Sequence, residues 1–438
     1  MAPAGAPPLR TTLALSIPAI LIGAVTALVL VGLTAIADVL QTFVWDGLPD
    51  VIGVQDTTGW WTMGVLTLTG LAVGLIVWLA PGHAGPDPAT TGLVEPPLAL
   101  GVLPALAVVL VIGEAGGVSL GPENPVMAIN AALAAAITTK VWPRVPLQLV
   151  VLMSAAGTLG ALFGTPAGAA LVLTGIVGMT AGGGALWDKL FLPLVAAGTG
   201  SLVMAMVGGP SVSVAVPPLG APELIDLISG VAIAAAAVLL GLAGVYLFPV
   251  LHRVFHRFRN PVLPLTVAGA LLGVLGVIGG PDTLFKGLTE MQDLTENAPE
   301  LGVGQLVAVT LIKMAALLIA ATSGFRGGRV FPSAFIGVGV GLVAHAVFAE
   351  IPLSLAIASG VLGMVLVVTR DGWLSIFLAV AVVADITVLP LLCIIVLPIW
   401  LMVTRQPQML ISSTTSTTAP AGPSVPQQSV SQQSASQH

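Results

Sequence analysis

The sequence predicts an all-α polytopic membrane protein made of two inverted halves with discontinuous helices. Of its 438 residues, 56% are hydrophobic and only 7% are charged, and the mean hydropathy is +1.07. A soluble domain carries about 25% charged residues, so a soluble protein is excluded. Apolar segments follow one another along the chain, and 52 glycines and 34 prolines interrupt them. The positions of the basic residues along the chain indicate that the two halves have opposite orientations in the membrane.

The apolar segments form two series, which we assign to a first membrane repeat over 11–210 and a second over 211–410. Several are shorter than the roughly 20 residues that cross a bilayer. Broken helices at membrane depth are tolerated where they line a cavity, and paired broken helices are typical of transporters with inverted repeats. The expected helices lie at about 11–37, 60–80, 98–113, 125–138, 146–163, 166–180, 186–208, 224–250, 262–279, 303–322, 331–348, 352–369, 372–389 and 389–404.

Three basic sites predict the orientation of the halves. Arg10 precedes the first repeat, the densest basic cluster is His252–Arg259, and Arg405 closes the second repeat. Because basic residues beside membrane helices favour the cytosol, the first repeat is expected to begin inside and the second outside. Both termini would then be cytoplasmic. Residues 1–10 form a short cytosolic N-terminus, and the uncharged tail 411–438, rich in Ser, Thr and Gln, is expected to be disordered.

Composition also excludes other classes of protein. The formal net charge of −6 argues against a nucleic-acid partner. A single cysteine, Cys393, excludes an internal disulfide framework. The five histidines are scattered, and we predict no metal site among them and no cofactor. We find no catalytic constellation of His, Asp and Ser, so an enzyme is not expected.

The motif Gly121-Pro122-Glu123-Asn124-Pro125 is the main functional candidate. An apolar run precedes it and an Ala-rich apolar run follows it. Proline is tolerated in the first turn of a helix, so the motif predicts a helix N-terminus. Free N–H groups and the helix dipole make such a terminus an anion site. A carboxylate inside the bilayer is functional by default, so we expect Glu123 to compete with an anion there and to act as a gate.

A second motif, Ser323–Pro332, has the same design in the second half. It also joins two apolar helices through a glycine-rich break that ends at a proline. The two helix N-termini are expected to face one shared site near the middle of the membrane.

These motifs resemble those of the CLC family of chloride channels and proton-coupled anion exchangers. Gly121–Pro125 matches the family's GREGP element, Ser323–Pro332 its GxFxP element, and Gly82–Pro86 its GSGIP element. The resemblance covers nearly the whole chain except the tail and is nearest to bacterial ion-transport proteins of the YfeO type. It implies a CLC-type fold of two inverted repeats, a homodimer with one pore per subunit, and a place in the bacterial plasma membrane. Small residues such as Ala161, Gly164, Gly168 and Gly175 would permit close helix packing at an interface.

The resemblance also implies which residues meet the anion. Glu123 would be the gate, and the anion-binding positions would be Gly82, His83, Ala84, Gly85, Pro86, Gly121, Pro122, Asn124, Pro125, Gly328, Arg329, Val330, Phe331, Pro332 and Met409.

The sequence departs from the family at three places. His83 and Ala84 stand where the family has a serine that donates to the anion, and Met409 stands where it has a tyrosine. The inner glutamate that relays protons in exchangers would fall near Gly175 and Ile176, where there is no carboxylate. We therefore expect channel-like conduction of an inorganic anion, chloride first. Proton-coupled antiport by another route, and selectivity for fluoride or nitrate, remain alternatives.

Four further residues have predicted roles. Arg329 either helps to bind the anion or pairs with a carboxylate such as Glu114. His83 either donates to the anion or packs. Lys313, in the middle of an expected helix, is predicted to be structural, and Glu114 is a substitute candidate for the proton relay.

Overall fold

The computed structural model describes residues 9–54, 59–179, 185–209 and 212–411, and every regular element in these ranges is helical. The first half contains α1 (Leu9–Thr42), α2 (Leu48–Ile52), α3 (Gly59–Leu79), α4 (Leu103–Ala115), α5 (Glu123–Val141), α6 (Leu147–Phe163), α7 (Pro166–Val172), α8 (Thr174–Met179) and α9 (Leu186–Val207). The second half contains α10 (Leu224–Phe255), α11 (Val262–Gly279), α12 (Leu288–Asn297), α13 (Val303–Ser323), α14 (Val330–Val347), α15 (Leu353–Thr369), α16 (Gly372–Val383) and α17 (Leu389–Val403).

The chain is a multi-pass membrane protein. Eight of the described helices are long and apolar enough to cross a bilayer, and several shorter apolar helices accompany them. Leucine, valine, isoleucine and tryptophan side chains are exposed on the outer helices, as on Trp78 of α3 and Leu239 of α10. In water such a surface would be unfavourable, whereas in lipid it is the expected one.

The two halves repeat the same helix contacts. In the first half, α1 packs against α4 and α6, and α6 packs against α5 and α7. In the second half, α10 packs against α13 and α15, and α15 packs against α14 and α16. The predicted pair of repeats with broken helices is therefore confirmed. The residue boundaries of the repeats, 11–210 and 211–410, remain a prediction.

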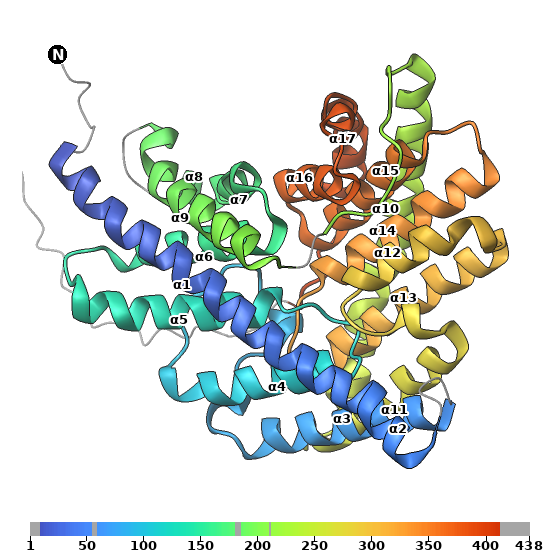
Figure 1. Cartoon of the computed structure of the whole chain (residues 1–438), viewed down its shortest axis with the longest axis horizontal. Helices are drawn as coiled ribbons and strands as arrows, with labels where there is room; N and C mark the ends of the chain where they lie inside the picture. The colour runs from blue at the N-terminus through green and yellow to red at the C-terminus, as the bar shows by residue number, and fades with distance from the viewer. Residues whose placement is uncertain (1–8, 55–58, 180–184, 210–211, 412–438) are drawn as a thin grey trace, which may run out of the picture.

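The halves meet along α3 and α11, which lie side by side at the lower edge of the molecule (Figure 1). Glycine allows this close approach: a Cβ atom at Gly70 would lie 2.2 Å from the backbone oxygen of Leu265. Any larger residue at Gly70 would push the two helices apart, since the obstacle is backbone. Small residues commonly permit such contact between membrane helices.

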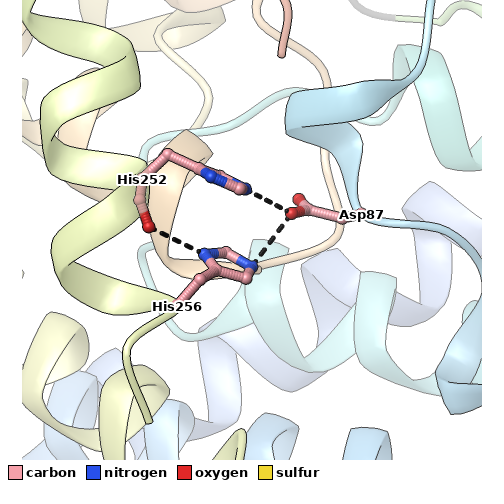
Figure 2. A group of neighbouring side chains, drawn as sticks. All are labelled: Asp87, His252 and His256. Atoms are coloured by element: carbon pink, nitrogen blue, oxygen red, sulfur yellow. Dashed lines mark hydrogen bonds and ion pairs between the residues drawn. The ribbon is translucent and has the colours of Figure 1, made fainter. Parts of the chain in front are cut away.

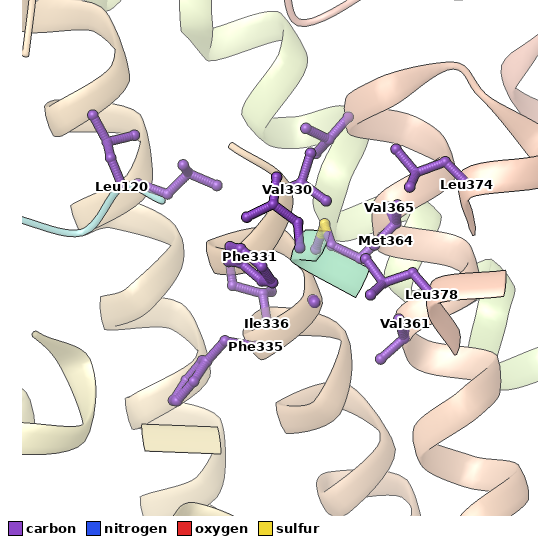
Figure 3. Packing of buried hydrophobic residues seen from close by; sticks show 14 of the residues in the cluster. Leu120, Val330, Phe331, Phe335, Ile336, Val361, Met364, Val365, Leu374 and Leu378 are labelled. Atoms are coloured by element: carbon purple, nitrogen blue, oxygen red, sulfur yellow. The ribbon is translucent and has the colours of Figure 1, made fainter. Parts of the chain in front are cut away.

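Helix α14 lies in the most buried part of the second half. Its first residues, Val330 and Phe331, pack with Val361 and Met364 of α15 and with Leu378 of α16 (Figure 3). A Cβ atom at position 337 of α14 would lie 2.5 Å from the Cα atom of Val361. This dense packing fixes the start of α14, which matters for the site below.

The predicted helix positions are largely confirmed, with three corrections. The segment 166–180 contains two short helices, α7 and α8, rather than one. The helix expected over 372–389 is shorter, because α16 ends at Val383. Helix α12 was not predicted, because it carries Glu290, Asp293 and Glu296 on one side and only its other side is buried, so it is no apolar run.

The structure divides the small residues expected at a subunit interface. Ala161 and Gly168 are buried inside this chain, whereas Gly164 and Gly175 are exposed, and the interface itself remains a prediction. A Cβ atom at Gly168 would lie 2.9 Å from Cβ of Phe377 in α16, so this glycine serves internal packing. The expected disorder of the tail concerns residues outside the described ranges, apart from Ile411.

Candidate functional site

Two helix N-termini, one from each half, meet as the motifs predicted. Helix α5 begins at Glu123 after Pro122, and α14 begins at Val330 after Arg329. The residues just before these caps form an antiparallel bridge. Gly121 N–H donates to the Gly328 oxygen at 2.9 Å, and Gly328 N–H donates back to the Gly121 oxygen at 2.6 Å. This reciprocal pair locks the two helix starts to each other.

The Glu123 side chain reaches from its own helix to the N-terminus of α14. Its Oε1 accepts a hydrogen bond of 2.7 Å from the backbone N–H of Phe331, the second residue of α14. The side chain is completely buried, and its Oε2 has no hydrogen-bond partner among the described residues. A carboxylate thus occupies the place where free N–H groups and the helix dipole attract an anion.

The bridge glycines make room for this carboxylate. A Cβ atom at Gly328 would lie 1.8 Å from Glu123 Oε2, and one at Gly121 would lie 2.4 Å from the same oxygen. Neither position tolerates a side chain while Glu123 holds this conformation. The space that the Glu123 carboxylate needs therefore explains glycine at positions 121 and 328.

The segment Gly82–Pro86 approaches the same region through Arg326. This segment turns sharply, with positive φ at Gly82, His83, Ala84 and Gly85. Arg326 donates to the His83 oxygen at 2.8 Å and to the Ala84 oxygen at 3.2 Å. The side chain of Arg326, in the break before α14, therefore ties the Gly82–Pro86 segment to the second half.

His83 uses its ring for a local contact. Its Nδ1 donates to the backbone oxygen of Val77 at 3.0 Å, at the end of α3. The side chain is exposed, and among the described residues it makes no hydrogen bond to Glu123 or to the start of α14. The role of His83 as an anion donor remains a prediction.

A small pocket lies between the first two motifs. It has a volume of about 40 Å³ and is lined by residues that include Pro86, Asn124, Pro125 and Arg326. Asn124 also donates to the Gly92 oxygen at 3.3 Å, which orients its side chain on this wall. A cavity of this size holds a water-sized species. Of the predicted residues, Pro86, Asn124 and Pro125 thus line one small, largely apolar pocket.

Arg329 and Met409 form a different contact from the predicted ones. The guanidinium of Arg329 donates to the Met409 backbone oxygen and, at 3.3 Å, to the Thr91 oxygen, and it lies 5.7 Å from the Phe248 ring. The predicted alternative of an Arg329 pair with Glu114 is wrong. Arg329 and Met409 instead fasten the segment after α17 to the site, and Met409 is fully buried.

Glu114 is paired with a different cation. Lys286 Nζ lies 3.7 Å from Glu114 Oε1, and both carboxylate oxygens lack a hydrogen-bond partner in the described part of the chain. The two side chains line a cavity of about 320 Å³ together with Asp38 and Glu290. A buried carboxylate beside a polar cavity is chemically able to exchange protons.

Lys313 has the predicted structural role. Its ammonium group is buried and donates to the backbone oxygens of Leu284 at 2.5 Å, Phe285 at 3.0 Å and Thr283 at 3.3 Å. It also lies 4.8 Å from the ring of Phe335 in α14. Lys313 thus holds the 283–285 segment between α13 and α14.

Sequence reasoning missed two residues at this site. Arg326 lies within the second motif, and the signal that could have identified it is a cation in a glycine-rich break. Ser119 is buried just before the Gly121 bridge, and its hydroxyl has no partner within the described ranges. A free hydroxyl beside the gate is a candidate anion donor in place of the family's serine.

Two opposed broken helices that share one buried carboxylate define a class: membrane proteins that transport ions through a site between repeats. The sequence model of the voltage gated chloride channel family matches residues 69–401. The chain therefore belongs to the CLC family of anion-transport proteins.

Curated relatives agree with this assignment. The chain is 48% identical over 404 residues to the "Putative ion-transport protein YfeO" of Salmonella newport (strain SL254), covering 92% of this chain and 97% of that one. The protein of the same name from Salmonella typhimurium (strain LT2) gives the same identity and coverage.

Solved structures confirm the CLC-type fold. The chain is similar to a CLC-type fluoride/proton antiporter, with a TM-score of 0.75, 18% identity, and coverage of 92% of this chain and 98% of that one. It is also similar to a slow cyanobacterial Cl⁻/H⁺ antiporter, with a TM-score of 0.73, 17% identity, and coverage of 90% and 95%.

Proposed function

We propose that this protein carries a small inorganic anion, chloride first, across the bacterial plasma membrane along a path that Glu123 gates. The observation that supports this most directly is the hydrogen bond from Phe331 N–H to Glu123 Oε1 at 2.7 Å. The carboxylate is itself an anion bound at the start of α14, so the same N–H groups would bind a transported anion when Glu123 leaves.

Charge explains why protonation would open the path. An ionised Glu123 repels a second anion strongly in a low-dielectric site, and it occupies the Phe331 N–H. A neutral Glu123 loses the repulsion and holds the N–H less tightly, because hydrogen bonds to charged groups are the stronger ones. Acidification should therefore increase anion flux.

Channel-like conduction is favoured over coupled exchange. The position of the exchangers' inner proton relay falls at Gly175 and Ile176 in α8, where this chain has no carboxylate. Neutral donors also suit conduction, since an ion must bind well enough to enter and weakly enough to leave. In our proposal transport, and not catalysis, is the activity, and both termini lie in the cytosol.

Proton-coupled antiport is the second candidate, and one observation favours it. Glu114 is buried beside a polar cavity of about 320 Å³ and lies at the end of α4, the helix before the break that leads to Glu123. The two solved structures named above are those of proton antiporters for fluoride and for chloride. Fluoride and nitrate are accordingly the alternative anions to test beside chloride.

The test is anion flux from liposomes that contain the purified protein, measured between pH 7.5 and about pH 4.5. Wild type should conduct faster at low pH. Glu123→Gln should conduct at neutral pH about ten- to a hundredfold faster, because the charge-assisted hydrogen bond that it weakens is worth about 1.5–3 kcal/mol. Its flux should no longer rise on acidification. Exposed Glu300 supplies the control, and Glu300→Gln should behave as wild type.

Proton measurements in the same vesicles decide between the two candidates. A chloride gradient should drive little proton movement in the wild type if the protein is a channel. Stoichiometric proton counter-transport that disappears in Glu114→Gln would instead establish exchange by another route. If the pH dependence of Glu123→Gln equals that of the wild type, Glu123 is not the gate.

The expected homodimer also remains a proposal. Its support is the family's architecture, and cross-linking in native membranes tests it. Recovery of monomers alone would contradict it.

A further inference from the structure

Three potential metal ligands converge outside the site described above (Figure 2). Asp87 lies in the segment after α3, His252 in the last turn of α10, and His256 directly after that helix. The Nε2 atoms of His252 and His256 lie 2.9 Å and 3.0 Å from the same oxygen, Oδ2 of Asp87. The three ligand atoms all lie within 4.8 Å of one another.

The expectation that the histidines are scattered is therefore wrong for two of them. His252 and His256 are four residues apart, which places them on one face of a helix. Their rings stack, with centroids 3.8 Å apart and planes inclined by 19°. The spacing was visible in the sequence, whereas the third ligand, 165 residues earlier in the chain, became evident only from the fold.

Backbone groups orient two of the three ligands. His256 Nδ1 lies 3.1 Å from the backbone oxygen of His252. A carbonyl oxygen only accepts, so Nδ1 carries a proton, and Nε2 is the atom that faces Asp87 and that a metal would bind in place of the proton shared with the carboxylate. On the other side, Asp87 Oδ1 accepts from the N–H of Ala89 at 3.0 Å, which leaves Oδ2 facing the histidines. Metal ligands are typically fixed by such outer hydrogen bonds.

Among the described residues, the ion-pair partners of Asp87 Oδ2 are the two imidazoles, and no arginine or lysine competes for this oxygen. A metal binds a carboxylate in its ionised form and would displace any proton that Oδ2 shares with the histidines. Nearby Arg326 leaves Asp87 free, because the hydrogen bonds of Arg326 go to the carbonyls of His83, Ala84 and Gly324.

We propose that Asp87, His252 and His256 bind a first-row divalent transition metal ion, with zinc as the reference ion. Two imidazoles and one carboxylate are a typical zinc ligand set. Tetrahedral zinc bonds of about 2.0–2.1 Å place neighbouring ligand atoms about 3.3 Å apart. The observed 2.9 Å and 3.0 Å need to widen by only a few tenths of an ångström. His256 is 40% exposed, which leaves the fourth position to water.

The bound ion would join segments that are distant in sequence. It would attach the 81–90 segment to the end of α10. The same segment already receives the Ile411 N–H on the Ala89 oxygen at 2.8 Å, and Arg326 donates to the His83 oxygen. A metal at Asp87 would therefore fasten the C-terminal end of the described chain and the Gly82–Pro86 segment to α10. The site does not depend on the proposed transport function.

The test uses the full-length protein, purified with a tag that lacks histidine and stripped with a chelator. Zinc is then titrated against a coloured zinc chelator, and thermal unfolding is followed at each concentration. We expect one zinc ion per chain and a melting temperature that rises with zinc. Nickel and copper should compete, whereas magnesium and calcium should not, because they prefer oxygen ligands.

Matched variants identify the ligands. His252→Gln and His256→Gln should each weaken zinc binding at least about tenfold, since even outer-shell changes at metal sites cost 10–100-fold. Asp87→Asn should do the same while its side chain still caps the Ala89 N–H. His345→Gln, in α14, is the control and should bind as wild type. If the wild type binds no zinc, or if the double variant of His252 and His256 binds as well as the wild type, the proposal is wrong and the cluster is an ion pair only.

Discussion

The starts of α5 and α14 are built alike and used differently. Each helix follows a glycine of the reciprocal bridge, and each has proline as its third residue, Pro125 in α5 and Pro332 in α14. In α14 the second residue, Phe331, offers its N–H to a partner. In α5 the first residue, Glu123, supplies the carboxylate that takes this N–H.

The difference lies in side chains and not in the backbone. In the proposed function, the start of α14 would bind an anion, and Glu123 of α5 would occupy that place with its own carboxylate. The supporting cations are unequal as well, because Lys313, Arg326 and Arg329 all belong to the second half. A repeated backbone can thus diverge into a gate and a receptor by few substitutions.

The largest expected effect concerns the hydrogen bonds of Lys313 in the second half, which brace the segment 283–285. Lys313→Met should lower the free energy of unfolding by about 3 kcal/mol, because it leaves the carbonyls of residues 283–285 without a donor at about 1–3 kcal/mol each. Chemical unfolding in detergent measures the change. Lys140→Met is the control, since Lys140 is exposed at the end of α5. An unchanged stability of Lys313→Met would show that the brace is not needed.

Substitutions at Gly121 and Gly328 test whether both halves leave the space that the Glu123 carboxylate occupies. Gly328→Ala would put Cβ 1.8 Å from Glu123 Oε2 and should force the carboxylate off α14. We expect a loss of about 2 kcal/mol, the value of a charge-assisted hydrogen bond, and increased anion flux at neutral pH. Gly121→Ala should act in the same direction but less.

Two further variants control this experiment. Adding Glu123→Ala to Gly328→Ala removes the clash and should restore much of the stability. Gly64→Ala in α3 meets open space and should change neither quantity. A Gly328→Ala protein with normal stability and normal flux would contradict the geometry of the gate.

Arg329→Gln separates fastening from anion binding. The guanidinium holds the Met409 and Thr91 oxygens, so its loss should reduce stability by about 1.5 kcal/mol. Thermal unfolding and anion affinity are measured on the same preparation. The anion affinity should change by no more than about twofold, because the guanidinium bonds the Met409 and Thr91 oxygens and not the anion. A tenfold change would correspond to about 1.4 kcal/mol. A large loss of affinity with normal stability would instead place Arg329 in direct contact with the anion.

The smallest effect is expected at Pro122, which caps α5 without an N–H. Its φ of −77° and ψ of −6° suit other residues. Pro122→Ala should destabilise the protein by about 0.4–1 kcal/mol, chiefly because the unfolded chain gains freedom. Flux should remain near that of the wild type. A marked rise in anion affinity would mean that the restored N–H contributes to the site.

Much of the fold could be predicted because lipid imposes a simple rule on sequence. A segment in lipid must satisfy its backbone hydrogen bonds internally as a helix. Apolar runs therefore identified most of the helices, and the paired glycine-rich breaks indicated the repeats. Helix α12 escaped because it is amphipathic, with Glu290, Asp293 and Glu296 among its ten residues. Two of the residues expected at a subunit interface, Ala161 and Gly168, are buried because small residues pack equally well within a chain, as Gly168 does against Phe377.

The site was predictable in its motifs but not in its pairings. Glu123 and the start of α14 were predicted from local sequence signals. These signals are a proline, a carboxylate and the N-terminus of a helix. The contacts of Arg326 with the His83 oxygen and of Arg329 with the Met409 oxygen join segments far apart in sequence, and nothing local encodes them. The same holds for Asp87 with His252 and His256.

The reciprocal bridge between Gly121 and Gly328 bears on how the path opens, because it holds the two helix starts together. Because two backbone hydrogen bonds hold the helix starts together, separating them would require the slow collective motions of microseconds to milliseconds. Rotation of one side chain requires no such separation and belongs to far shorter times. We therefore expect the arrival of a proton at Glu123, and not movement of the two halves, to limit how fast the path responds to a drop in pH.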